Sequence, residues 1–173
     1  MPILTKVECF NDDRNKISEM MYYGNIPLVG DEIVLDADGD LLAKIPYSHG
    51  KKHGTERVYA KDRKVSMLIR WHKGKQSGRQ AEYEDGKLVR SSEWREGKLH
   101  GLEEFYDSYQ DCVKTVEWKW GRKHGKEIEY DSMGREKSVV FWNRGKRFGR
   151  KIFFDSRGKR ISFIRAFLRE LIP

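Results

Sequence analysis

The feature that most constrains this chain is an internal repeat. The motif Gly-Lys/Arg-x-x-Gly occurs five times, and its copies begin at Gly50, Gly74, Gly97, Gly121 and Gly145. Successive first glycines are therefore 24, 23, 24 and 24 residues apart. A fixed period in this range is the signature of repeat architectures, in which each unit packs mainly on its neighbours. We expect one small unit used in tandem.

Two aromatic positions keep the phase of the glycines. One stands three residues before each first glycine, and the other stands five residues after each second glycine. The first set is Tyr47, Trp71, Trp94, Trp118 and Trp142, and the second is Tyr59, Tyr83, Tyr106, Tyr130 and Phe154. A degenerate upstream copy has Tyr23, Gly30 and Leu35 at corresponding places, with Ile26 at the first glycine. We expect the Trp and Tyr rows to line one face and replace a conventional core.

Between the turns the apolar period is two, as in Ile69 and Trp71, which predicts strands joined by glycine turns. Repeated carboxylates such as Glu103 and Glu127 fall between apolar positions, and we expect them to face solvent. The predicted fold is all-β: an elongated single-layer antiparallel meander of about six hairpin repeats, from two strands per unit.

A second turn follows each later aromatic, usually as D-x-x-G or D-G, with glycine at 39, 86, 134 and 158. The copies at 61–63 and 107–111 lack that glycine. Because glycine readily supplies a positive φ, these two turns are expected to differ in geometry.

Composition agrees with a thin structure. The 173 residues are 36% charged and 38% hydrophobic, yet five Trp, eight Tyr and eight Phe argue against disorder. The net charge of +8 permits anionic partners without choosing one. Cys9 and Cys112 lie in no C-x-x-C motif, and we see neither a signal peptide nor a long apolar span. We expect a soluble, basic, cytoplasmic protein with reduced thiols.

The ends differ from the repeats. Residues 1–22 are expected to form an irregular N-terminal cap with a turn at 11–13, and residues 23–160 the repeat array. Residues 161–173 show helical periodicity, with Ser162 as an N-cap and an apolar stripe that includes Phe163, Phe167 and Leu171. We interpret them as a capping helix; a membrane-surface or partner-docking helix is the alternative.

No constellation of catalytic or metal-ligating residues stands out. His53, His100 and His124 share one repeat position, so they would be spread along the array, whereas zinc ligands must converge on one ion. The glycine motif is a hairpin turn rather than a phosphate-binding loop between a strand and a helix. We expect no enzymatic activity, no metal, no cofactor and no small-molecule substrate.

The unit resembles the MORN repeat, most closely the bacterial variant of antitoxin and immunity proteins. The clearest copy is Trp94-Arg95-Glu96-Gly97-Lys98-Leu99-His100-Gly101-Leu102-Glu103-Glu104-Phe105-Tyr106. The resemblance covers residues 40–160 well and 20–40 weakly. It implies a scaffold fold, and a toxin as one partner.

Two functional hypotheses remain open. The first is a protein-binding scaffold that uses the aromatic face, since Trp and Tyr are enriched at binding hot spots. Its expected contacts are Trp71, Trp94, Trp118, Trp142, Tyr83, Tyr106 and Tyr130. The alternative is an anion-binding adaptor for nucleic acid or acidic lipid, which uses a basic rim at the glycine turns. The rim comprises Lys51, Lys52, Lys75, Lys98, Arg122, Lys123, Lys146 and Arg147.

Overall fold

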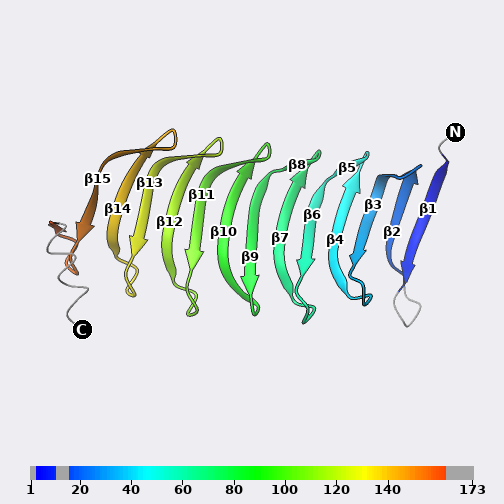
Figure 1. Cartoon of the computed structure of the whole chain (residues 1–173), viewed down its shortest axis with the longest axis horizontal. Coiled ribbons are helices and arrows are strands. Elements are labelled where there is room, and N and C mark those ends of the chain that lie inside the picture. The colour runs from blue at the N-terminus through cyan, green and yellow to red at the C-terminus, as the bar shows by residue number, and fades with distance from the viewer. Residues whose placement is uncertain (1–2, 11–15, 163–173) are drawn as a thin grey trace. The chain divides into compact units, whose positions relative to one another are not determined.

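The computed structural model describes residues 3–10 and 16–162, and it is all-β over these ranges (Figure 1). The first strands are β1 (Leu4–Phe10), β2 (Lys16–Tyr23), β3 (Ile26–Leu35), β4 (Leu41–Ser48), β5 (Lys51–Lys52), β6 (Gly54–Tyr59), β7 (Val65–His72), β8 (Lys75–Gln76) and β9 (Gly78–Glu84). They are followed by β10 (Lys87–Arg95), β11 (Lys98–Tyr106), β12 (Cys112–Lys119), β13 (Arg122–Tyr130), β14 (Glu136–Asn143), β15 (Lys146–Phe154) and β16 (Arg160–Ile161).

The chain divides into two compact units. The first comprises residues 1–86 and 94–97, and the second comprises residues 87–93 and 98–173. In the first unit the strands follow the order β1-β2-β3-β4-β6-β7-β9, with β5 on β4 and β8 on β7. In the second unit β10 to β16 follow in chain order. Each unit is thus an antiparallel meander, which confirms the all-β, antiparallel part of the predicted fold class.

The glycine turns are two-residue hairpin turns of type I′. In each, a non-glycine residue and the following first glycine both have positive φ, for example Glu96 at 52° and Gly97 at 77°. This turn type matches the right-handed twist of the flanking strands. Neighbouring turns are also joined: Gly121 N–H donates to the carbonyl of Leu99 at 2.8 Å, and Gly145 N–H to that of Lys123 at 2.8 Å. The turns of each unit therefore lie beside one another.

The two second turns that lack glycine keep the geometry of the turns at Gly39, Gly134 and Gly158, so the prediction that they differ is wrong. Arg63 and Gln110 take the place of glycine with φ of 62° and 70°. The closing bond from Asp107 N–H to the Asp111 carbonyl is 3.0 Å, against 2.9 Å for Asp131 and Arg135. The closing backbone bond, which recurs in each of these turns, holds a non-glycine residue in the left-handed region at a conformational cost.

The Trp and Tyr rows lie on opposite faces, contrary to prediction. The second glycine of a motif pairs directly with the next tryptophan, as Gly101 does with Trp118 and Gly125 with Trp142. Directly opposed residues share a face, and side chains alternate along a strand. Tyr130 stands five residues beyond Gly125, an odd number, so it falls on the other face.

Few side chains are fully buried, as a thin structure requires. The buried hydrophobic residues among those described are Met20, Ala43, Ile45, Val116 and Val139. The buried polar residues are Glu56, Gln80, Ser91, Ser92, Glu103 and Ser138. The Glu103 carboxylate was expected to face solvent, and that expectation is wrong.

The two ends of the chain differ from what the sequence predicts. In the N-terminal segment, expected to be an irregular cap, β1 and β2 pair as antiparallel strands, with Leu4 opposite Tyr23, Val7 opposite Met20 and a register shift between Cys9 and Phe10. The expected turn at 11–13 lies outside the described residues. So does the expected capping helix from residue 163 onward, although Ile161 belongs to β16. No helix in the described part of the chain has the length and apolar character needed to cross a bilayer.

Candidate functional site

The most distinctive cluster is a ladder of tryptophans bonded to acidic side chains. The acid stands two residues after a second glycine, and it accepts the indole N–H of the next repeat's tryptophan. Trp71 Nε1 donates to Glu56 at 2.7 Å in the first unit. In the second unit, Trp118 donates to Glu103 at 2.8 Å and Trp142 to Glu127 at 2.8 Å. We call these pairs, with the cations that bond to them, the Trp–Glu ladder.

The spacing of residues along the strands explains why each acid meets its tryptophan. The acid and the second glycine are two residues apart on one strand, so they share a face. Glu127 lies opposite Val140 on β14, and Trp142 lies two residues beyond Val140 on the same face. Val140 is small and half-buried, so it leaves the Trp142 indole within reach of the Glu127 carboxylate.

In two of the Trp–Glu pairs, which we call rungs of the ladder, a lysine contacts both the ring and the carboxylate. Lys52 Nζ lies 4.7 Å from the centre of the Trp71 ring and 2.9 Å from Glu56 Oε2. In the second unit, Lys123 Nζ lies 4.8 Å from the centre of the Trp142 ring and 2.8 Å from Glu127 Oε2. Each lysine therefore combines a cation–π contact with an ion pair, which fixes the ring from two directions.

The rung at Glu103 uses a different cation. Leu99 occupies the position that lysine holds in the other two rungs, and Arg90 of β10 bonds to Glu103 instead, with Nε at 2.9 Å. The Glu103 residue is only 3% exposed, and these partners supply the hydrogen bonds that a buried carboxylate needs. In the third repeat Gln80 replaces the acid, and its amide contacts Gln76 and Glu82.

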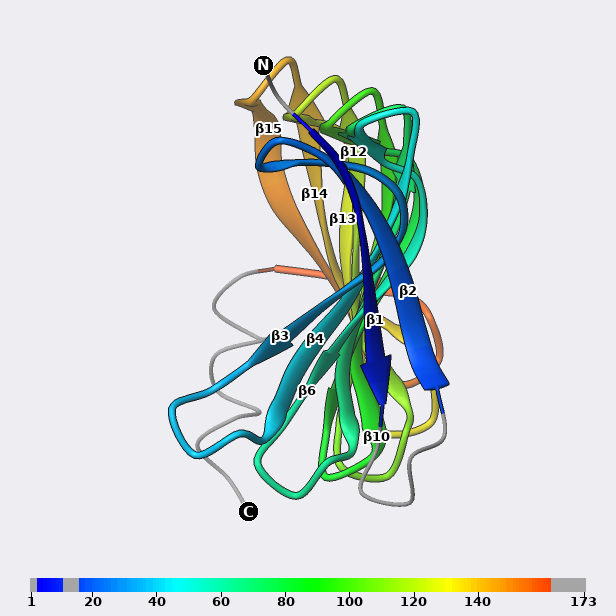
Figure 2. The same ribbon diagram turned by 90° about the vertical axis from the view of Figure 1, so that its right-hand side faces the viewer.

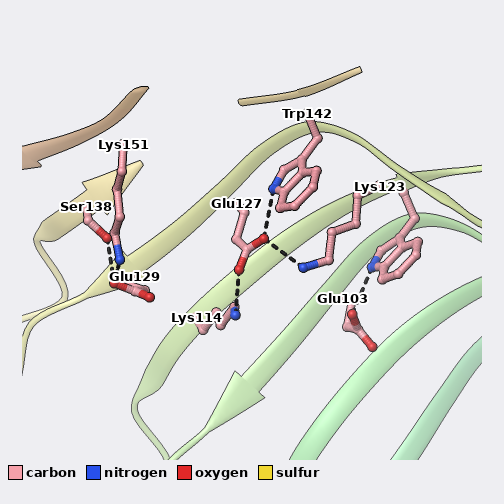
Figure 3. A network of polar contacts seen from close by, with 9 residues as sticks. Glu103, Lys114, Lys123, Glu127, Glu129, Ser138, Trp142 and Lys151 are labelled. Atoms are coloured by element: carbon pink, nitrogen blue, oxygen red, sulfur yellow. Dashed lines mark hydrogen bonds and ion pairs between the residues drawn. The ribbon is translucent and has the colours of Figure 1, made fainter. Parts of the chain in front are cut away.

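Figure 3 shows how the charges of the second unit are matched: Glu127 lies between Trp142, Lys123 and Lys114, and Glu129 bonds to Lys151 and Ser138. Burial acts to raise the pKa of Glu127, but hydrogen bonds from Lys114 and Lys123 outweigh it, so the pKa lies below its ordinary value. Burial likewise opposes the bonds from Lys151 and Ser138 at Glu129, and its pKa is also lowered. Both groups are therefore carboxylates at neutral pH.

The predicted aromatic contacts are all half-buried, and the structure does not gather them on one surface. Trp71, Trp94 and Tyr83 belong to the first unit, and the other four to the second. On the Tyr face, the Tyr130 hydroxyl lies 3.2 Å from Thr115 Oγ1. The Trp and Tyr rows are thus two separate surfaces in each unit.

The residues of the predicted basic rim do not all lie on one face. Lys52, Lys123 and Arg147 lie opposite Tyr47, Trp118 and Trp142, and the first two of these cations point into the ladder. Lys51, Lys75, Lys98, Arg122 and Lys146 are exposed. Lys75 pairs with Glu96 at 2.7 Å, whereas Lys98, Arg122 and Lys146 have no ion pair within the described residues.

The repeated histidines act on the turns. His53 Nδ1 accepts a long bond from Lys73 N–H at 3.4 Å, and His124 does the same for Arg144 at 3.5 Å. His100 instead packs edge-on against Trp120, with ring centres 4.7 Å apart, and its buried Nδ1 has no hydrogen bond in the described part of the chain.

Within the described ranges, no group of three or more His, Cys, Asp or Glu side chains is placed to hold a metal ion. The hollows found there are shallow and lie near turns; one, of about 350 Å³, is lined by His53, Trp71 and His72 among others.

Sequence reasoning missed the buried acids of the ladder. A signal was available, since Glu56, Gln80, Glu103 and Glu127 all stand two residues after a second glycine. A repeated acid in phase with a repeated indole donor is a pattern that predicts a bonded pair.

Comparisons with known proteins give little. No family model and no curated protein matches the sequence. Among solved structures, one match is a mutant of S. aureus TarM in complex with fondaparinux, α-GlcNAc-glycerol and UDP, at 16% identity. The alignment covers 69% of this chain and only 22% of TarM, with a TM-score of 0.30. A likeness this low carries no argument about fold or function.

Proposed function

We propose that this chain is a non-enzymatic protein-binding scaffold, and that the Trp–Glu ladder of the second unit forms its binding surface. The observation that carries the proposal is that carboxylates anchor both Trp118 and Trp142, and that Lys123 adds a cation–π contact at Trp142. The buried Glu103 and the half-buried Glu127 each hold an indole N–H, while the rings themselves stay partly exposed. Aromatic side chains held in place before binding lose little conformational entropy on association, which favours hot-spot contacts.

The charges of the ladder favour a protein partner over a polyanion. Lys114 and Lys123 already bond to Glu127, and Lys151 bonds to Glu129. A surface with compensated charge offers little attraction to phosphate, whose binding to proteins relies on unpaired Lys and Arg. By its resemblance to the antitoxin-type MORN proteins, the first partner to test is a toxin.

Because the two aromatic rows lie on opposite faces, one experiment can separate them. Full-length chain is immobilised, and proteins from a native lysate are quantified on it by mass spectrometry. The variant Trp118→Ala/Trp142→Ala removes rings from the ladder face, and Tyr106→Ala/Tyr130→Ala is the matched control on the other face. We expect the Trp variant to lose captured partners and the Tyr variant to keep them.

Thermal melts of both variants accompany the capture, since only folded protein is compared. Loss of capture in the Tyr variant alone would show that the binding site lies on the Tyr face instead. Equal capture by wild type and both folded variants would reject a site on either aromatic row.

The exposed cations support a second candidate function, anion binding at the turns of the second unit. Lys98, Arg122 and Lys146 protrude without ion pairs within the described residues. If nucleic acid is the ligand, its affinity will fall steeply with salt, and reversal of these three charges will abolish binding. If a protein is the ligand, the same reversal will mainly slow association.

A further inference from the structure

Strand β1 is an exposed edge of the first unit. It pairs with β2, and it is the first strand in the order of the sheet (Figure 1, Figure 2). Three of its apolar side chains are exposed: Leu4 at 57%, Val7 at 42% and Phe10 at 53%. An edge strand of this length with exposed apolar residues and no proline is a template for pairing with another strand.

The backbone groups on the outer edge can be identified. Gly24 N–H donates to the Ile3 carbonyl at 3.1 Å, in register with the β1–β2 pairs. In an antiparallel pair the hydrogen-bonded residues alternate, so Thr5, Val7 and Cys9 direct their N–H and C=O groups toward β2. Leu4, Lys6, Glu8 and Phe10 direct theirs outward, where none of the described residues pairs with them as a strand.

The sequence of β1 is complementary to itself. When a second β1 runs antiparallel with Val7 opposite Val7, Leu4 meets Phe10, Thr5 meets Cys9, and Lys6 meets Glu8 of the second copy. Each outward-facing residue then meets another outward-facing residue, so the backbone bonds can form in full. We propose that two copies of this chain associate through β1, antiparallel and centred on Val7.

Charge selects this register over its neighbours. Pairing centred on Lys6 would place lysine opposite lysine, and pairing centred on Glu8 would place glutamate opposite glutamate. Like charges directly opposite destabilise a strand pair, whereas opposite charges stabilise it. A two-fold axis at Val7 repeats each contact, so both ion pairs and both Leu–Phe contacts form at once, as an isologous interface requires.

The first test is the oligomeric state of the full chain, measured by sedimentation from low to high micromolar concentration. We expect a monomer–dimer equilibrium. Lys6→Glu should raise its dissociation constant about tenfold or more, because two opposite-charge pairs become like-charge pairs. The swap Lys6→Glu/Glu8→Lys restores the complementary pairs and should restore dimerisation. Lys61→Glu, at an exposed loop position, carries the same change in charge and should leave the dimer unchanged.

The second test reads the register directly. Thr5 and Cys9 of the second copy form a non-hydrogen-bonded pair, in which Cα atoms lie about 4.5 Å apart. That separation suits a disulfide. In a Cys112→Ser background, Thr5→Cys should therefore give a covalent dimer in an oxidising glutathione buffer. Leu4→Cys, whose side chain lies on the opposite face from Cys9, should not.

Three results would overturn the proposal. One is a chain that stays monomeric throughout the concentration range. Another is a dimer whose dissociation constant is indifferent to Lys6→Glu. The third is a dimer in which Thr5→Cys and Leu4→Cys cross-link to the same extent, since that would exclude the register centred on Val7.

Discussion

Replacing Glu103 by leucine should destabilise the protein strongly, although the residue lies on a strand in a sheet with little apolar core. The side chain accepts bonds from Trp118 and Arg90, and the residue is 3% exposed. Its loss leaves an indole N–H without a partner, at a cost of about 1–3 kcal/mol. The Arg90 side chain is 34% exposed and can be rehydrated, so the lost ion pair adds at most about 1 kcal/mol.

The expected total is about 1–4 kcal/mol, or a fall of about 2–16 °C in the melting temperature for a chain of this size. Chemical denaturation followed by tryptophan fluorescence and circular dichroism measures it. Glu117→Leu is the matched control on the neighbouring strand, because Glu117 is exposed and should change the stability by less than about 0.5 kcal/mol.

A double-mutant cycle with Trp118→Phe isolates the bond itself, since phenylalanine keeps a ring and removes the donor. A hydrogen bond to a charged group predicts a coupling of about 1.5–3 kcal/mol. If the two substitutions are additive within about 0.3–0.5 kcal/mol, the Trp–Glu ladder does not stabilise the fold and the reasoning is refuted.

Other consequences follow from the same geometry. Gly125→Val should destabilise far more than Lys98→Ala in thermal melts, because Gly125 lies in β13 with a φ of 99°, which a β-branched residue rarely adopts; equal melting temperatures would show that this position does not require glycine. The pKa of Glu127 is lowered in the folded state, so its contribution to stability is present above the unfolded value of about 4.3 and is lost as pH falls through the folded pKa. Denaturation across pH 2–7 should therefore show a shallower acid loss for Glu127→Gln than for wild type, and parallel curves would exclude this role. Arg63→Gly should raise the free energy of unfolding by up to about 1 kcal/mol by relieving a left-handed residue, because the ion pair that it loses with Asp40 is exposed and contributes little. Gln110→Gly should gain less, because the Gln110 side chain also bonds to the backbone of Leu88 at 3.1 Å, and an equal gain at both sites would show that those bonds contribute nothing.

The local structure of this protein could be predicted from the sequence alone. The period, the strands and the glycine turns were all apparent, because turn chemistry depends on consecutive residues. Gly97 and Gly121 adopt the positive φ that a two-residue hairpin turn requires. The meander then follows, since each strand needs only its neighbour in sequence as a partner.

Properties that depend on register could not be predicted in this way. Whether Trp118 and Tyr130 share a face depends on which residue opposes the second glycine, and the pairing across strands decides that. The same pairing buries Glu103 beside Val116, where periodicity alone predicted a solvent-facing acid.

The second turns are a case in which tertiary structure overrides the local preference of the sequence. Arg63 and Gln110 are poor choices for a left-handed position, so local preference predicted a different turn. The strands on either side fix the length of the connection, and the closing backbone bonds then impose the conformation that glycine adopts elsewhere. Sequence determined which segments are strands and turns, because those choices are local; tertiary structure decided which side chains meet, because pairing joins residues that are distant in sequence.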